Sequence, residues 1–159
     1  MEVLDEAVES HGNVLLVPMH IDQDVSFCEG LRAQMKSPGA ARVLAADVLS
    51  PLEVRELIRR AKMMIAFRLH AGIVATAAGV PTLTYYYVDK GRVYGDQVGM
   101  SAFTRPIEAM VTDDALVHHR EREKALLSPA PELAEMRVRL ANMREAIHTT
   151  FAQVIAGSK

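Results

Sequence analysis

Arg68 and His70 are the residues of this sequence with the clearest capacity for chemistry. They directly follow the apolar run 63–66, which predicts a buried strand, and they precede an Ala-rich segment that predicts a helix beginning near His70. A guanidinium group binds phosphate or carboxylate, a helix start favours an anion, and an imidazole exchanges a proton near neutral pH. The pair therefore predicts an anion-binding corner. A structural Arg paired with a carboxylate, beside a His that caps a turn, would give the same local pattern.

A second polar segment follows the apolar run that ends at Tyr87. It reads Val88-Asp89-Lys90-Gly91-Arg92. If the strands are parallel, this loop lies at the same edge of the sheet as Arg68, and Lys90 can reach an anion held there. The alternative is a solvated lysine beside Asp89.

His20, Asp22 and Asp24 form a third group, shortly after the first apolar run. Imidazole and carboxylate are metal ligands, but one strand end supplies all three residues and no partner motif occurs elsewhere. Capping of the next helix by Asp24 or Ser26, or a polar contact from this segment to a substrate, fits the pattern better. The sequence therefore predicts no metal site.

Short apolar runs alternate with helical patterns from residue 12 to residue 105. The predicted strands are 14–17, 42–46, 63–66 and 82–87. The predicted helices are 2–10, 24–35, 50–60, 71–78 and 93–98. This order predicts an α/β fold, a doubly wound parallel sheet with right-handed crossovers, in which ligands bind at the carboxyl ends of the strands. The loops expected at that edge are 18–24, 47–50, 67–70 and 87–92.

Several helix ends carry specific signals. Ser50-Pro51-Leu52-Glu53 predicts a capping box with proline at the first helical position. Gly12, Gly79 and Gly99 are each predicted to end a helix, because glycine adopts the left-handed conformation that a helix end needs.

Beyond Thr104 the pattern is helical, with helices predicted over 113–126 and 131–155. His118 and His119 lie in a charged run that predicts a solvated face. The second helix has an apolar stripe that is predicted to pack on a core. The residues of this stripe are Leu133, Met136, Leu140, Met143, Ile147, Phe151 and Ile155.

Composition narrows the class of protein. The chain has 159 residues, a hydrophobic content of 50% that supports one core, and a net charge of −2, which gives no basis for nucleic-acid binding. The single cysteine, Cys28, excludes a disulfide within the chain and predicts a small buried residue rather than a nucleophile. The acidic N-terminus is unlike a signal peptide and no apolar run is long enough to cross a membrane, so the sequence predicts a cytoplasmic protein.

The motifs around Arg68 resemble those of the polysaccharide pyruvyl transferases. In that family an apolar strand, Arg-Leu-His-Ala, an apolar helix, Gly-Val-Pro, a strand and a Tyr-Asp-Pro-Lys loop follow one another. Here the match runs from Arg68-Leu69-His70-Ala71 through Gly79-Val80-Pro81 to Tyr87-Val88-Asp89-Lys90, with Val88 and Asp89 in the places of Asp and Pro. The resemblance covers residues 12–105, with a less specific helical segment over 108–156.

The resemblance implies transfer of a pyruvyl group from phosphoenolpyruvate to two sugar hydroxyls as a ketal, in polysaccharide biosynthesis. It implies that Arg68, Leu69, His70 and Lys90 hold the donor, with Arg68 and His70 as catalytic groups and no cofactor. His20, Asp24, Tyr87 and Asp89 are further candidate site residues.

The family's fold is similar to that of GT-B glycosyltransferases, with two Rossmann-like lobes, and this chain resembles only the C-terminal lobe. The expected partners are phosphoenolpyruvate, a saccharide acceptor, which in this family is often lipid-linked at the inner face of the membrane, and the missing N-terminal lobe. An exposed lobe surface would also favour a homo-oligomer. Two alternatives are a GT-B lobe that binds a nucleotide-sugar and a non-catalytic interaction domain.

Overall fold

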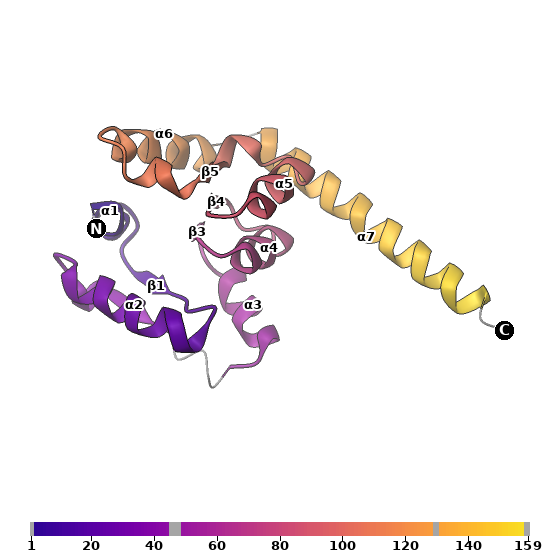
Figure 1. Cartoon of the computed structure of the whole chain (residues 1–159), viewed down its shortest axis with the longest axis horizontal. Coiled ribbons are helices and arrows are strands. Elements are labelled where there is room, and N and C mark those ends of the chain that lie inside the picture. The colour runs from indigo at the N-terminus through magenta and orange to yellow at the C-terminus, as the bar shows by residue number, and fades with distance from the viewer. Residues whose placement is uncertain (1, 45–48, 129–130, 158–159) are drawn as a thin grey trace.

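Strands and helices alternate along the chain in the computed structural model, which describes residues 2–44, 49–128 and 131–157 (Figure 1). The strands are β1 (Val14–Leu16), β2 (Ala41–Val43), β3 (Met64–Ala66), β4 (Thr82–Tyr86) and β5 (Thr104–Pro106). The helices are α1 (Glu2–His11), α2 (Ile21–Gln34), α3 (Pro51–Arg59), α4 (Leu69–Ala77), α5 (Asp89–Gln97), α6 (Ala115–Leu127) and α7 (Pro131–Gly157).

All strand pairs in the described residues are parallel. β1 pairs with β2, and Val14 lies opposite Ala41. β4 lies between β3 and β5, and its Thr84 lies opposite Ala66 on one side and Thr104 on the other. The chain thus winds from β1 toward β2 and from β3 toward β4 and β5. This confirms the predicted α/β class, a Rossmann-like doubly wound arrangement with helices at the C-terminal end.

The predicted helix ends are largely confirmed. Ser50 and Glu53 form both hydrogen bonds of the capping box at the start of α3. Gly12, Gly79 and Gly99 follow α1, α4 and α5 with φ angles of 90°, 77° and 76°. These values lie in the left-handed region, where a side chain would be strained.

Two predicted helix starts are wrong, and one strand was missed. α2 begins at Ile21, with His20 as its extended N-cap residue and no side-chain cap, so neither Asp24 nor Ser26 caps it. α5 begins at Asp89 rather than at residue 93, which places Lys90 in a first helical turn. β5 was not predicted at all. The ends of two further predictions, the strand 42–46 and the loop 47–50, lie partly outside the described residues.

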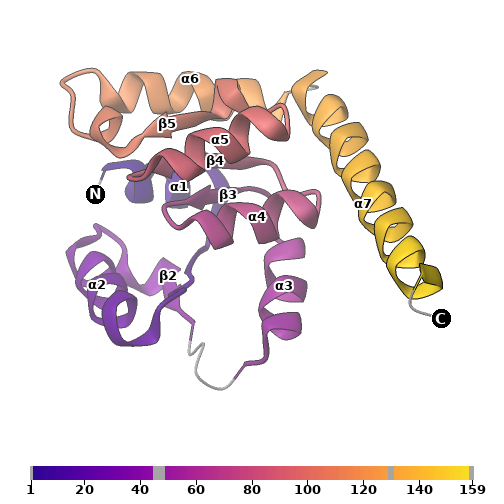
Figure 2. The same ribbon diagram turned by 45° about the vertical axis from the view of Figure 1, so that its right-hand side comes forward.

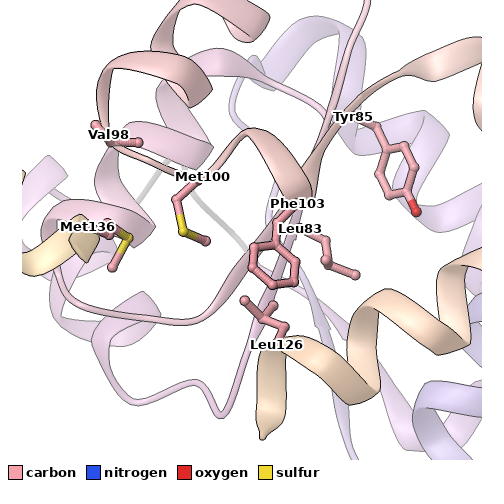
Figure 3. Packing of buried hydrophobic residues seen from close by; sticks show 7 residues of the cluster. All are labelled: Leu83, Tyr85, Val98, Met100, Phe103, Leu126 and Met136. Carbon is pink, nitrogen blue, oxygen red and sulfur yellow. The ribbon is translucent and has the colours of Figure 1, made fainter. Parts of the chain in front are cut away.

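The main core lies between β4 and the C-terminal helices (Figure 3). Leu83 and Tyr85, alternate residues of β4, belong to the same buried cluster as Leu126 of α6 and Met136 of α7, and Met136 lies beside Val98 and Met100. A second cluster joins α3 to α4 behind β3. Its buried residues are Ile58, Ala75 and Val80. The first cluster thus packs β4 against α6 and α7, and the second packs α3 against α4.

Two predictions for the C-terminal part need correction. Met136 is fully buried and Leu133 and Leu140 pack beside it, but the apolar residues that follow are exposed, up to 68% for Ile155, because α7 runs past the end of the core (Figure 2). His118 is exposed as predicted, whereas His119 is only 2% exposed. His119 points inward because it lies seven residues, about two helical turns, before buried Leu126, and so on the same face of α6.

Cys28 is buried in α2, as predicted, and burial raises the pKa of its thiol. None of the helices in the described ranges is long and apolar enough to span a membrane.

Candidate functional site

Arg68 connects three segments that follow β1, β3 and β4. It is the N-cap residue of α4, directly after β3 and Phe67. Its Nη2 donates to Asp24 Oδ1 at 2.6 Å and lies 3.4 Å from Gln23 Oε1, both in the first turns of α2. Its Nη1 donates to the Tyr87 hydroxyl at 3.1 Å, after β4. The guanidinium group therefore joins the segment after β1, a strand of the two-stranded sheet, to the carboxyl ends of β3 and β4 in the three-stranded sheet. Ligands of doubly wound α/β folds bind at the carboxyl ends of the strands.

Asp24 is the anchor of this cluster. Its Oδ2 accepts hydrogen bonds from the backbone N–H groups of Met19 and His20, at 3.1 Å and 3.0 Å. The hydrogen bond from Arg68, assisted by these backbone bonds, lowers the pKa of the Asp24 carboxyl, although partial burial opposes the shift. The same bond raises the pKa of Arg68, so both groups are charged at neutral pH.

The Arg68–Asp24 pair is the contact that a structural role for Arg68 predicted. The same alternative also predicted that His70 caps a turn, and this is wrong. No side chain caps the start of α4, and His70 forms no hydrogen bond to any described residue. His70 is exposed in the first turn of α4, next to Leu69, which is half-buried. The imidazole is thus available to a ligand at the edge where Arg68 lies.

Lys90 is the second residue of α5, as His70 is the second residue of α4. It is exposed in the first helical turn, and its amine has no hydrogen-bond partner among the described residues. Asp89 does not pair with Lys90, because both of its carboxylate oxygens accept hydrogen bonds from Arg92, at 2.8 Å and 3.1 Å. Arg92 lowers the pKa of the Asp89 carboxyl through these bonds. The structure thus leaves Lys90 as an uncompensated cation beside a helix start.

A hollow of about 350 Å³ runs between α4 and α5 and has Lys90 at its rim. It is lined mainly by apolar side chains, including Leu69, Ile73 and Val93. It extends from the first turns of α4 and α5, at the edge that carries Arg68 and His70, along α5 as far as Gln97 at the end of that helix.

The residues of the remaining predicted group do not converge. Asp24 turns toward Arg68, whereas His20 and Asp22 are exposed. Within the described ranges, no three His, Cys, Asp or Glu side chains lie close enough together to hold a metal ion.

Sequence reasoning missed two contacts of the site. Gln23 was not singled out, although it neighbours Asp24 in the segment predicted for the ligand edge. Phe67 stacks on Tyr85 with 5.7 Å between ring centroids, and the hydroxyl of Tyr85 lies 2.9 Å from Nδ1 of buried His119. The alternation of residues in β4 could have indicated an inward Tyr85, but no local signal pointed to its contact with His119.

Comparison with known protein families gives a match that includes most of this edge of the sheet. The family model described as polysaccharide pyruvyl transferase matches residues 2–89, which is more than half of the chain. The chain belongs to the polysaccharide pyruvyl transferase family. Neither the curated proteins nor the solved structures include a significant match to it.

The family match covers much of the cluster described above. Asp24, Arg68, His70 and Tyr87 lie inside the matched range, and Lys90 is the first residue beyond it. Membership supports a pyruvyl transferase of polysaccharide biosynthesis as the general class of the protein.

Proposed function

We propose that this member of the polysaccharide pyruvyl transferase family carries the donor half of the transferase site. It binds phosphoenolpyruvate, and the pyruvyl group passes to two hydroxyls of a saccharide acceptor. The observation that carries the proposal is the convergence of Arg68, the exposed His70 and the uncompensated Lys90 at one sheet edge. The acceptor and the catalytic base belong to the opposite half of the cleft, which we expect from a second lobe.

The reaction sets clear demands on the donor site. The methylene carbon of phosphoenolpyruvate gains a proton and becomes a methyl group, the adjacent carbon forms bonds to two acceptor oxygens, and its bond to the phosphate oxygen breaks. Of the two hydroxyl protons released by the acceptor, one balances the new methyl group and the other leaves with inorganic phosphate. The site must therefore hold a carboxylate and a phosphate, donate one proton, and tolerate positive charge at the ketal carbon.

The residues at this edge suit these demands. Arg68 and Lys90 supply fixed positive charge for two anionic groups, and the starts of α4 and α5 add backbone N–H groups that favour anions. His70 is exposed beside them and can hold or deliver a proton near neutral pH. We assign donor binding to Arg68, Leu69, His70 and Lys90, and proton transfer to His70.

Thermal unfolding in the presence of phosphoenolpyruvate tests the proposal. At a concentration of about 100 times Kd, a ligand stabilises the folded state by about 2.7 kcal/mol, which for a domain of this size raises Tm by roughly 5–10 °C. We expect this protection in the wild type and its loss in His70→Ala and Lys90→Ala. Both side chains are exposed and lack described partners, so the unliganded variants should unfold near the wild-type temperature.

Arg55 provides a matched control, because it is an exposed cation on α3 whose side chain forms no described hydrogen bond. Arg55→Ala should keep the full protection, and inorganic phosphate should protect less than phosphoenolpyruvate. Unchanged protection in both His70→Ala and Lys90→Ala would refute the assigned residues. Protection by a UDP-sugar but not by phosphoenolpyruvate would instead support a nucleotide-sugar-binding lobe, and protection by neither would support a non-catalytic domain.

A further inference from the structure

Asp24 is an unexpected residue to find in contact with an anion-binding arginine. Its carboxylate is ionised and lies 2.6 Å from Nη2 of Arg68, so it places a negative charge beside the region where the anionic donor is proposed to bind. Two charges of the same sign repel at such short range, which by itself would weaken donor binding. If Asp24 belongs to the donor site, it must therefore favour donor binding in a way that outweighs this repulsion.

The carboxylate of Asp24 is more firmly held than the guanidinium it contacts. Its side chain is 16% exposed, against 35% for Arg68. One carboxylate oxygen is fixed by the backbone N–H groups of Met19 and His20, in the segment between β1 and α2, so only the other oxygen faces Arg68. Because the backbone holds the Asp24 carboxylate in place, this carboxylate can orient the flexible side chain of Arg68 and does not move with it.

Tyr87 holds the opposite side of the same guanidinium group. Its hydroxyl accepts a hydrogen bond from Nη1 of Arg68, and the Cζ atom of Arg68 lies 5.9 Å from the centroid of its ring. Contacts on both terminal nitrogens fix the plane of the group, while Nε has no hydrogen-bond partner among the described residues. A long arginine side chain otherwise has many rotamers, which a ligand would have to restrict on binding.

We infer that Asp24 is a positioning residue of the donor site, which together with Tyr87 holds the Arg68 guanidinium group in a fixed orientation with part of its donor edge free for an anion. The inference rests on the proposed function for the identity of that anion. It differs from a role for Asp24 as a substrate contact or as an internal competitor of the donor. A competitor would have to leave Arg68 when phosphoenolpyruvate arrives, whereas a positioning residue stays in contact with it.

Binding of phosphoenolpyruvate to three variants separates these roles, measured by calorimetry on folded protein. Asp24→Ala removes both the charge and the anchor, and we expect Kd to rise by about tenfold or more, because a charge-assisted hydrogen bond that orients Arg68 is lost. Asp24→Asn keeps the shape and one accepting oxygen, so its Kd should lie between those of the wild type and Asp24→Ala. Tyr87→Phe changes no charge at neutral pH and should raise Kd by a few-fold.

Tighter binding in both Asp24 variants would overturn the inference, because it would mark Asp24 as a competitor. Unchanged Kd in Asp24→Ala would also overturn it, since a merely structural residue would alter the melting temperature and not the affinity. If Asp24→Ala does not fold, the comparison of Asp24→Asn with Tyr87→Phe still decides, since only positioning predicts weaker binding in both.

A second measurement needs no ligand. The order parameter of the Arg68 Nε–H bond, from ¹⁵N relaxation, should be high in the wild type and fall in Asp24→Asn, while that of Arg55 stays low in both. Equal mobility of Arg68 in the two proteins would overturn the inference. If the wild type fails to bind phosphoenolpyruvate, the proposed function fails, but this measurement still tests whether Asp24 positions Arg68.

Discussion

Replacing Gly95 by alanine tests the close packing of α5 against β5. Gly95 lies in the last turn of α5, where it faces Thr104 of β5. A Cβ atom at this position would lie 2.5 Å from Oγ1 of Thr104, 2.8 Å from its Cβ and 2.9 Å from its Cγ2. These distances are far shorter than a normal contact between non-bonded atoms. The added methyl group therefore requires α5 or β5 to move.

The expected loss of stability combines three effects. Alanine favours a helix interior over glycine by about 1 kcal/mol, which stabilises the variant. Overpacking costs about 1–3 kcal/mol. The Thr104 hydroxyl also donates to the Met100 carbonyl at 2.9 Å, and losing this bond costs about 1 kcal/mol. The net result is a destabilisation of about 1–3 kcal/mol, which corresponds to a Tm lower by roughly 2–12 °C.

Gly30 provides the matched control, because it also lies inside a helix, α2, and a Cβ there would meet nothing within 4 Å. Gly30→Ala should therefore stabilise the protein by up to about 1 kcal/mol. Differential scanning calorimetry of the two variants should show Tm shifts of opposite sign. A Gly95→Ala variant as stable as Gly30→Ala would refute the close packing of α5 on β5. The comparison also bears on function, because that packing sets the position of Lys90 in the first turn of α5.

Two further predictions concern buried side chains. Burial lowers the pKa of His119, so its contribution to stability is complete above the unfolded pKa of about 6.5 and is lost as the pH falls toward the lower pKa of the folded state. Between pH 7.5 and pH 5.5, guanidinium unfolding should therefore show a smaller loss of unfolding free energy in His119→Gln than in the wild type. An equal loss in the two proteins would contradict the burial of a neutral His119. Met136→Ala should cost about 2–5 kcal/mol, whereas Met143→Ala, seven residues along α7 and 41% exposed, should change the unfolding free energy by less than about 0.5 kcal/mol. Equal losses in the two methionine variants would show that α7 packs along its whole length.

Local signals account for most of what the sequence predicted correctly. The apolar runs predicted β1, β3 and β4, because a strand buried between helices needs apolar residues on both faces. The glycines after α1, α4 and α5 predicted helix ends, since the left-handed conformation is a property of single residues. Ser50 and Glu53 specify their helix start by themselves.

Predictions failed where a residue's environment is set by distant parts of the chain. β5 has only three residues and contains Pro106, so no apolar alternation marks it, and it is defined by its pairing with β4. The apolar stripe of α7 continues at three- and four-residue steps to Ile155, but this spacing does not reveal where the core beneath the helix ends. His119 lies among charged neighbours, and its burial depends on the contact with Tyr85.

In the candidate site too, some features have local sequence signals and others depend on distant residues. The edge that carries Arg68, His70 and Lys90 follows from strand order, because parallel strands place their carboxyl ends together. The pairing of Arg68 with Asp24 joins residues that are 44 positions apart and has no local signature. Either residue could have been assigned to the edge from sequence alone, but not their contact.

That contact limits what Arg68 can do for a ligand. Asp24, Gln23 and Tyr87 occupy N–H groups on both of its terminal nitrogens, so only part of the guanidinium group remains for an incoming anion. A donor with a carboxylate and a phosphate cannot be neutralised by Arg68 alone, particularly beside the charge of Asp24. The second cation must come from another element, and Lys90 is a cation at this edge that forms no ion pair with any residue in the described part of the chain. On this reasoning Lys90→Ala should weaken binding of phosphoenolpyruvate more than binding of pyruvate, which lacks the phosphate, and equal losses for the two ligands would assign Lys90 to the carboxylate instead.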